Sequence, residues 1–254
     1  MSQIITNNLV KNGFHKFRLN KKEYFILKKK LLKKISKPKN INLEYIHKLI
    51  TIKKLNNFRL NLFKKINNDQ KFKNMLYKSA KNQIENCVGS ELSCSDINLS
   101  IQFPNDQNSL LSMHTDFFSG ESIFQANLWV PFMNVKKTQS MFIMSPSNSI
   151  KILKKIKNNK KIDFQMIEKR YRKFMKWIPL KEGEGMIFSP NCLHGNVINR
   201  EKKTRVSINI RYKNLFSPYS NFKNEKKIGT FYKPYTISSI TKFNLKYNFD
   251  EIAK

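Results

Sequence analysis

A histidine and an aspartate stand two residues apart near the middle of the chain, as His114 and Asp116. On an extended strand, residues i and i+2 point to the same face, so an imidazole and a carboxylate at this spacing can bind one ion. His194, far downstream, offers a third ligand of a suitable type. Two histidines and one carboxylate on one face of a metal ion leave its opposite positions open. The three residues therefore predict a metal site with room for further ligands.

An arginine follows the second histidine at about the length of one strand. Arg205 lies in Thr204–Ile210, where polar and apolar residues alternate as in a half-buried strand. A guanidinium in this position could hold a carboxylate through two parallel hydrogen bonds. Arg211 lies an even number of residues further on, so a regular strand places both arginines on one face. Arg211 could then bind an anion of the substrate, or form a salt bridge at the surface.

The order of these residues, His-x-Asp, a distal histidine and a spaced arginine, resembles the Fe(II)/2-oxoglutarate-dependent dioxygenases. Residues 113–131, 140–149 and 183–211 carry the resemblance, and their context is most similar to the phytanoyl-CoA-hydroxylase-like branch. Within that branch, the chain resembles the 2-oxoglutarate/iron oxygenases of bacterial surface-carbohydrate gene clusters. The corner at residues 145–149 matches the family pattern only loosely, and the resemblance extends over roughly residues 90–215.

The resemblance implies a mainly β fold with helices (α+β), in which a double-stranded β-helix or jelly roll is braced by N-terminal helices. It implies that the triad holds Fe(2+), that 2-oxoglutarate chelates the iron through its keto acid end, and that O2 takes the remaining position. The distal carboxylate of 2-oxoglutarate would pair with Arg205, helped by a hydroxyl such as Thr138 or Ser207. The reaction would be hydroxylation of a small or carbohydrate-linked substrate, as in surface polysaccharide biosynthesis. Halogenases of the family lack the carboxylate ligand, so Asp116 favours hydroxylation or desaturation, with an isomerase also open.

A strand expected just after the metal pair supplies further candidates for the site. Its period places Gln125, Asn127 and Trp129 on one face. In the family this strand faces the site, so Gln125 and Asn127 become candidates for binding 2-oxoglutarate and Trp129 for binding substrate, unless this face is simply solvated. Phe117 and Phe118 follow the metal pair directly and could form a wall of the substrate pocket.

Apolar spacing and the resemblance together divide the chain into three regions. Residues 1–90 are expected to form an N-terminal helical support region, since apolar residues recur at helical spacing from Tyr24 onward. Residues 91–215 are expected to form the double-stranded β-helix catalytic core, with a Lys-rich helical insertion at 150–177 that covers the site or merely decorates the surface. Residues 216–254 are rich in aromatic residues and are expected to form a tail that packs on the core.

Local signals predict where some elements begin and end. Residues 1–20 are expected to be mixed, with a short strand or loop around residues 13–17. Pro38 is expected to break the first helix, and Asn40 or Asn42 is expected to cap the second. Gly89 ends the helical part, and the alternation after it indicates the first strand of the core.

The net charge of +32 suggests an anionic partner, which could be nucleic acid, a membrane surface or a phosphorylated substrate. Only seven of the 49 basic residues are arginine, and the lysines are spread along the whole chain. An AT-rich genome therefore explains the charge better than a nucleic-acid role does. A lysine-rich surface would still favour a nucleotide-sugar or another phosphorylated substrate.

The cysteines and the first residues of the chain indicate in which cellular compartment the protein lies. Cys87, Cys94 and Cys192 are an odd number without metal-finger spacing, which fits a reducing compartment. No apolar run approaches the roughly 20 residues that span a bilayer, and the first residues lack the pattern of a secretory signal. The sequence therefore predicts a cytoplasmic protein without a membrane span.

Three functional interpretations follow. The favoured one is an oxygenase acting on a small or carbohydrate-linked molecule. The second is an oxygenase acting on nucleic acid, which would need basic residues clustered around the mouth of the site and salt-sensitive binding. The third is a non-catalytic, cupin-like metal-binding barrel, against which the presence of all three ligands and Arg205 counts.

Overall fold

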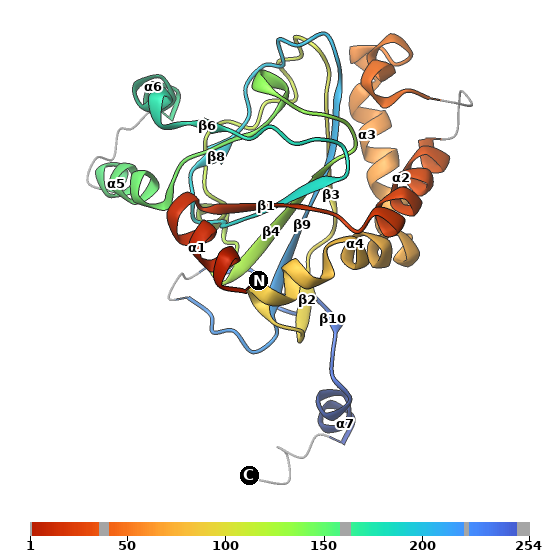
Figure 1. Cartoon of the computed structure of the whole chain (residues 1–254), viewed down its shortest axis with the longest axis vertical. Coiled ribbons are helices and arrows are strands. Elements are labelled where there is room, and N and C mark those ends of the chain that lie inside the picture. The colour runs from red at the N-terminus through yellow and green to blue at the C-terminus, as the bar shows by residue number, and fades with distance from the viewer. Residues whose placement is uncertain (1, 36–40, 158–163, 221–223, 248–254) are drawn as a thin grey trace.

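The computed structural model describes residues 2–35, 41–157, 164–220 and 224–247, and two antiparallel sheets form its centre (Figure 1). The larger sheet has seven strands: β1 (Phe14–Arg18), β2 (Leu92–Cys94), β3 (Asn98–Gln102), β4 (Gln125–Pro131), β7 (Glu184–Phe188), β9 (Arg205–Asn214) and β10 (Lys233–Thr236). The smaller sheet has three: β5 (Phe142–Ile143), β6 (Lys176–Trp177) and β8 (His194–Gly195). The predicted fold class, α+β with a double-stranded β-helix core, is confirmed.

The larger sheet has the order β1-β7-β4-β9-β2-β10, and β3 also pairs with β9. Strand β9 is its centre, because it pairs with β4 along one side and with both β3 and β2 along the other. The register places Asn127 opposite Arg211 and Ser100 opposite Ser207. The smaller sheet has the order β6-β5-β8 and carries His194 in β8.

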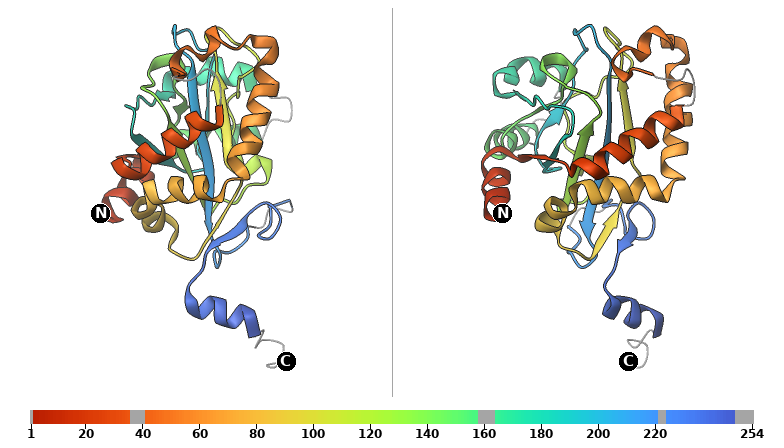
Figure 2. Two further views of the ribbon diagram at one scale, coloured as in Figure 1. Left: turned by 90° about the vertical axis from the view of Figure 1, so that its right-hand side faces the viewer. Right: turned by 45° about the vertical axis from the view of Figure 1, so that its right-hand side comes forward.

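Helices surround the sheets, and a layer of helices lies on one face of the larger sheet (Figure 2). The α-helices are α1 (Ser2–Asn12), α2 (Lys21–Ile35), α3 (Ile52–Asn67), α4 (Gln70–Val88), α5 (Pro146–Lys157), α6 (Phe164–Tyr171) and α7 (Ser239–Tyr247). Short 3-10 helices are η1 (Leu43–Lys48), η2 (Asp116–Ser119), η3 (Lys137–Gln139) and η4 (Arg172–Phe174). Among the described helices, none combines the length and apolar character that crossing a membrane requires.

The alternation of β9 determines which side chains face the helices and which face the interior of the barrel. Its even-numbered residues are apolar and pack into the main core together with α2, α3 and α4: Val206, Ile208, Ile210 and Tyr212. Its odd-numbered residues in the first part of the strand are polar and line an interior cavity: Arg205, Ser207, Asn209 and Arg211. Burial of the apolar face holds the register, because a slip by one residue would exchange the two faces. The strand therefore delivers a polar row to the interior.

Local capping explains several helix boundaries. The Asn42 side chain accepts a hydrogen bond of 3.0 Å from the main-chain nitrogen of Glu44, which confirms the predicted cap. Asp69 caps α4 in the same way, through the nitrogen of Phe72 at 3.0 Å. Gly89 ends α4 with a φ of +80°, a conformation that favours glycine. Pro38 and Asn40 lie outside the described residues.

The N-terminal segment contains both a helix and a strand. Residues 2–12 form helix α1, within the region expected to be helical. Only Ile5 of this helix is buried, so the sequence carries little helical periodicity there. The element expected around residues 13–17 is a strand: residues 14–18 form β1, which pairs with β7. The N-terminal region therefore contributes a strand to the larger sheet as well as helices.

The insertion and the tail occupy separate places. Helices α5 and α6 contribute Ile152 and Ile167 to a second apolar cluster, which also contains Phe142 and Leu193 of the region around the smaller sheet. The C-terminal tail returns to the larger sheet as β10, which pairs with β2, while α7 projects away from the body (Figures 1 and 2). Residues 158–163 of the insertion and residues 221–223 and 248–254 of the tail lie outside the described residues.

Candidate metal centre

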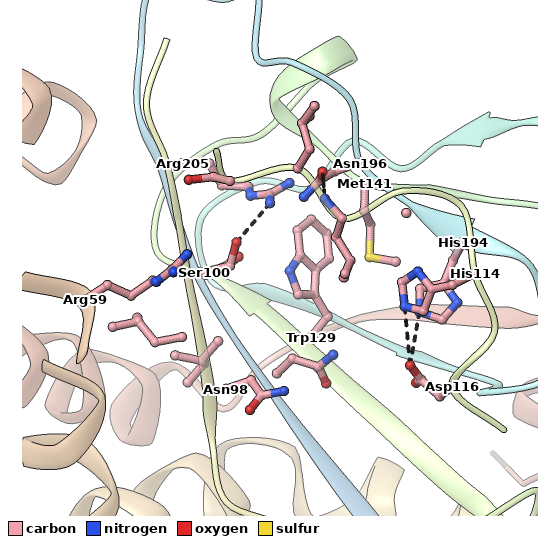
Figure 3. A pocket seen from close by; sticks show the side chains of 18 of the residues that line it. Arg59, Asn98, Ser100, His114, Asp116, Trp129, Met141, His194, Asn196 and Arg205 are labelled. Atoms are coloured by element: carbon pink, nitrogen blue, oxygen red, sulfur yellow. Dashed lines mark hydrogen bonds and ion pairs between the residues drawn. The ribbon is translucent and has the colours of Figure 1, made fainter. Parts of the chain in front are cut away.

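The three predicted ligands meet at one point. His114 and His194 form an isolated antiparallel bridge, with both main-chain N–H···O hydrogen bonds at 2.9 Å. The distances from Asp116 Oδ1 to the Nε2 atoms of His114 and His194 are 3.5 and 3.6 Å (Figure 3). One ligand atom from each of the three side chains lies within 4.8 Å of the others, and within the described part of the chain no other such cluster exists.

The local backbone differs from the regular strand that the spacing predicts. His114 takes part only in the bridge, and Asp116 begins the 3-10 helix η2. Thr115 between them is extended, with φ −121° and ψ 144°. One extended residue is enough to bring residues i and i+2 to one side, so the spacing argument holds although the strand is not regular.

Main-chain carbonyls orient both imidazoles. The Nδ1 atom of His114 lies 2.7 Å from the oxygen of Ser112, and that of His194 lies 2.8 Å from the oxygen of Cys192. A carbonyl oxygen only accepts, so each Nδ1 carries a proton and Nε2 is the ring nitrogen available to a metal. Metal-binding histidines usually donate their other N–H to a carbonyl or carboxylate in this way, and both Nε2 atoms face Asp116.

The charges of the triad suit a cation. Burial lowers the pKa of His194 to about 4, so its imidazole is neutral at pH 7. Burial alone would raise the pKa of Asp116, but the hydrogen bond with His114 and the positive charge of Arg211 outweigh it and hold the pKa well below its usual range. A neutral imidazole and an ionised carboxylate are the forms that bind metals. Two nitrogens and one carboxylate with an open side fit Fe(II).

A buried network of hydrogen bonds and ion pairs holds Asp116 in position. The Asn127 amide donates to Asp116 Oδ2, and Arg211 Nη2 lies 3.7 Å from Asp116 Oδ1. Arg211 Nε in turn donates to Glu121 at 2.6 Å, and the Gln125 amide donates to both Glu121 and Asn127 at 2.8 Å. Gln125 and Asn127, which the sequence offers as cosubstrate contacts, thus bond to one another and to the acidic residues at the triad.

The C-terminal tail completes this network. The Tyr232 hydroxyl donates to the Gln125 side-chain oxygen and accepts a hydrogen bond of 2.9 Å from the nitrogen of Ser122. Lys226 lies 3.3 Å from Glu121. Sequence reasoning did not find Glu121 or Tyr232, because nothing local in the sequence relates them to residues a hundred positions away.

A cavity of about 470 Å³ opens in front of the triad. Trp129 and Met141 lie in its middle, and Arg205 lines it away from the triad (Figure 3). Arg205 is 3% exposed. Its Nη1 donates to the main-chain oxygen of Gln139 at 3.2 Å, and its Nη2 donates to Ser100 at 3.0 Å. Burial lowers its pKa to about 10, so the guanidinium remains charged at neutral pH.

The polar row of β9 has unused hydrogen-bonding groups. Among the described residues, Arg205 Nε, Ser207 Oγ and Asn209 Oδ1 are buried and have no hydrogen-bond partner. A buried polar atom without a partner costs about 1–3 kcal/mol. Three in succession on the cavity face of one strand indicate a place built for a polar ligand.

The remaining predicted residues lie in different places. Trp129 and Arg211 line the cavity. Phe117 and Phe118 pack on one another with their ring centroids 4.3 Å apart, and neither belongs to the cavity lining. Thr138 accepts a hydrogen bond of 2.9 Å from a main-chain nitrogen and borders a separate hollow. The structure therefore brings Ser207, but not Thr138, to the cavity that contains Arg205.

No protein-family model matches the sequence, and a search of curated proteins finds no match. Solved structures share the fold. The non-heme monooxygenase ThoJ, in its nickel complex, has a TM-score of 0.55 at 14% sequence identity, over 98% of this chain and 96% of ThoJ. SnoK, a non-heme α-ketoglutarate-dependent carbocyclase from nogalamycin biosynthesis, has a TM-score of 0.55 at 10% identity, over 93% and 97% of the two chains. CytC3 with Fe(II) and α-ketoglutarate has a TM-score of 0.51 at 12% sequence identity, over 88% of this chain and 82% of CytC3.

At identities this low, the TM-scores show only that the chain shares its fold with these solved non-haem enzymes. The chemistry of this chain must be argued from its own side chains, because one fold supports many functions.

Proposed function

We propose that this protein is an Fe(II)- and 2-oxoglutarate-dependent oxygenase that hydroxylates or desaturates a small molecule. One observation carries the proposal. A compact His-Asp-His triad opens into a cavity that also contains a buried arginine, Arg205, with no carboxylate partner among the described residues. The resemblance of the sequence to this class of enzymes and the shared fold support it independently.

The residues of the chain have distinct tasks in this proposal. His114, Asp116 and His194 would hold the iron, which supplies the oxidising chemistry once 2-oxoglutarate and O2 have bound. Arg205 would bind the distal carboxylate of 2-oxoglutarate through its free N–H groups. The buried Ser207 hydroxyl, which has no other partner among the described residues, would donate to the same carboxylate.

Other side chains would shape and support the site. Trp129 and Met141 would exclude water from the space between Arg205 and the triad. Asn127 would act as a positioning residue, because its amide bonds the Asp116 oxygen that faces away from the histidines. We propose Gln125 as a support for Asn127, rather than as a direct contact of the cosubstrate.

The cavity volume suits a small molecule, since about 300–1,000 Å³ is usual for ligand pockets. The proposal also retains the carbohydrate-linked substrates of polysaccharide biosynthesis that the resemblance implies. A sugar of this kind would place its reacting carbon before the triad and use the polar side chains of β3 and β9. Fe(II), 2-oxoglutarate and O2 are required in either case.

The test is an anaerobic titration of the purified protein with Fe(II) and then 2-oxoglutarate, followed by visible absorption. A charge-transfer band that requires both ligands is the expected result. Asp116→Ala should abolish the band, whereas Asp96→Ala, at an exposed position, should leave it unchanged. His114→Ala and His194→Ala should abolish iron retention.

Two results would contradict the proposal. If iron binds but 2-oxoglutarate produces no band, the chain is a cupin-like metal protein with other chemistry. If neither binds, the triad does not form a metal site, and the charge-driven interpretation, binding to nucleic acid, becomes the leading one.

A further inference from the structure

Helix α3 closes the cavity at the open edge of the larger sheet. Strand β3 pairs only with β9 within the described residues, and α3 lies against β3. Arg59, Leu60 and Phe63 of α3 line the cavity. Figure 3 shows Arg59 and Asn98 on one side of Trp129 and the triad on the other. The cavity therefore has a second end, remote from the metal ligands.

This second end carries a cation without a counter-charge. Arg59 is half-buried, and its Nη2 donates to the neutral side chain of Asn56 at 2.8 Å. Among the described residues, no carboxylate lies within ion-pair distance of it. A guanidinium has several further N–H donors in a planar fork that suits carboxylate and phosphate groups.

Polar groups on the neighbouring strands lie at the same end. Asn98 and Asn209 are directly opposite in the register of β3 and β9, so their side chains share one face. Both line the cavity, and the side-chain oxygen of Asn209 is buried without a partner in the described structure. Together with Arg59 they offer a charged donor, amide donors and an unused acceptor.

In the proposed complex with iron and 2-oxoglutarate, the charge of Arg59 is not balanced by any of the other groups. The positive charges of Fe(II) and Arg205 would be matched by Asp116 and the two carboxylates of 2-oxoglutarate. Arg211 is matched by Glu121 at 2.6 Å. Among the described residues that line the cavity, Arg59 would then be a cation without an anion, and charges in a partly desolvated site favour pairing.

Exposed apolar side chains also belong to the lining of the cavity. Leu60, Leu110 and Leu111 line the cavity and are 48%, 41% and 55% exposed. Three exposed apolar side chains that line one cavity favour a ligand with an apolar part, because contact with it removes apolar surface from water.

We infer that the substrate is an organic anion with an apolar portion, whose carboxylate or phosphate is bound by Arg59 between α3 and the Asn98–Asn209 pair. That this ligand is the substrate rests on the proposed function, but its binding at Arg59 requires neither iron nor 2-oxoglutarate.

The test is isothermal titration calorimetry on the full chain, without added metal, at moderate salt. The probes are octanoate, octyl phosphate and the neutral octyl glucoside, so that they share one apolar chain and differ in the head group. Arg59→Gln removes the charge, and Lys64→Gln removes the same charge from an exposed position of the same helix. Gln favours helix about as well as Arg or Lys, so both variants should fold.

We expect at least one anionic probe to bind Arg59→Gln about tenfold more weakly than wild type, as for loss of a charged hydrogen-bond partner. Lys64→Gln should match wild type, and octyl glucoside should bind both proteins with equal affinity. The stronger of the two anionic probes identifies carboxylate or phosphate as the group recognised.

Several outcomes would overturn the inference. They are equal affinity of wild type and Arg59→Gln for both anions, an equal loss in Lys64→Gln, or no binding of either anion to wild type. A loss in Arg205→Gln instead of Arg59→Gln would place the anion at the proposed cosubstrate position and would also refute it. Because no metal is present, these outcomes are independent of the iron titration that tests the oxygenase proposal.

Discussion

Replacing Arg205 by glutamine should weaken 2-oxoglutarate binding without removing the metal. The side chain is 3% exposed, and only its two terminal nitrogens bond to the protein, both to neutral oxygens. Its Nε has no partner among the described residues. The guanidinium therefore retains the charge and the N–H groups to bind a carboxylate, and it does not contact the triad.

The magnitude follows from the number of bonds that a carboxylate would lose. A hydrogen bond to a charged group contributes about 1.5–3 kcal/mol, and a carboxylate on the free part of Arg205 would accept about two from this fork. Losing both should cost about 3 kcal/mol or more, which is about 100-fold in affinity. Glutamine keeps a polar side chain in the buried position, so the loss reports mainly on the charge and the fork.

The assay is the half-saturating concentration of 2-oxoglutarate for the charge-transfer band, at fixed anaerobic Fe(II). Arg205→Lys should be intermediate, because it keeps the charge but not the planar fork. Arg18→Gln, at an exposed position of β1, is the matched control and should equal wild type. Melting temperatures show that each variant is folded. A half-saturation of Arg205→Gln within about twofold of wild type would refute the reasoning, and Arg211 would become the candidate.

Three other substitutions have defined outcomes. Asn127→Ala removes the amide that bonds Asp116, so iron affinity should fall by about 10–100-fold, measured by chelator competition; unchanged affinity would contradict a positioning role. Gly195→Ala should lower the melting temperature, because a Cβ would lie 2.8 Å from a main-chain oxygen that cannot easily move; an unchanged melting temperature would show that the loop adjusts. Lys213→Met removes the cationic partner of the buried Glu225, which lies at 3.1 Å. The free energy of unfolding, measured by chemical denaturation at pH 7, should fall by about 3 kcal/mol. Burial would raise the pKa of Glu225, but its hydrogen bonds lower it from 4.5 to about 2, so the stabilisation is present above pH 4.5 and is lost as the pH falls towards 2; wild-type stability that does not fall over this range would contradict the pKa.

Residues close in sequence were the ones that the sequence could place. The pair His114 and Asp116 needs only one extended residue between them to face one ion, and Thr115 is extended. The alternation around Arg205 predicts a polar row on one face of a strand, and that row lines the cavity. These predictions depend on backbone geometry over a few residues, which is the same in any fold.

Residues that act through distant partners could not be assigned in this way. Gln125 and Asn127 share the predicted face, but only the tertiary structure shows that they bond to Glu121 and Asp116 rather than remaining free in the cavity. Thr138 and Ser207 were equal candidates by residue type, and packing brought only Ser207 to the cavity.

The amino-acid pattern by itself predicted the metal ligands and the arginine strand, and the family resemblance of the ordered motif implied the jelly-roll core. Tertiary packing decided which polar side chains remain without partners, that Tyr232 of the tail supports the network behind Asp116, and that α3 brings Arg59 to the cavity. A hydrogen bond or an unpaired charge depends on distances between segments far apart in the chain. Such distances exist only once the helices have packed on the sheet, and local sequence does not encode them separately.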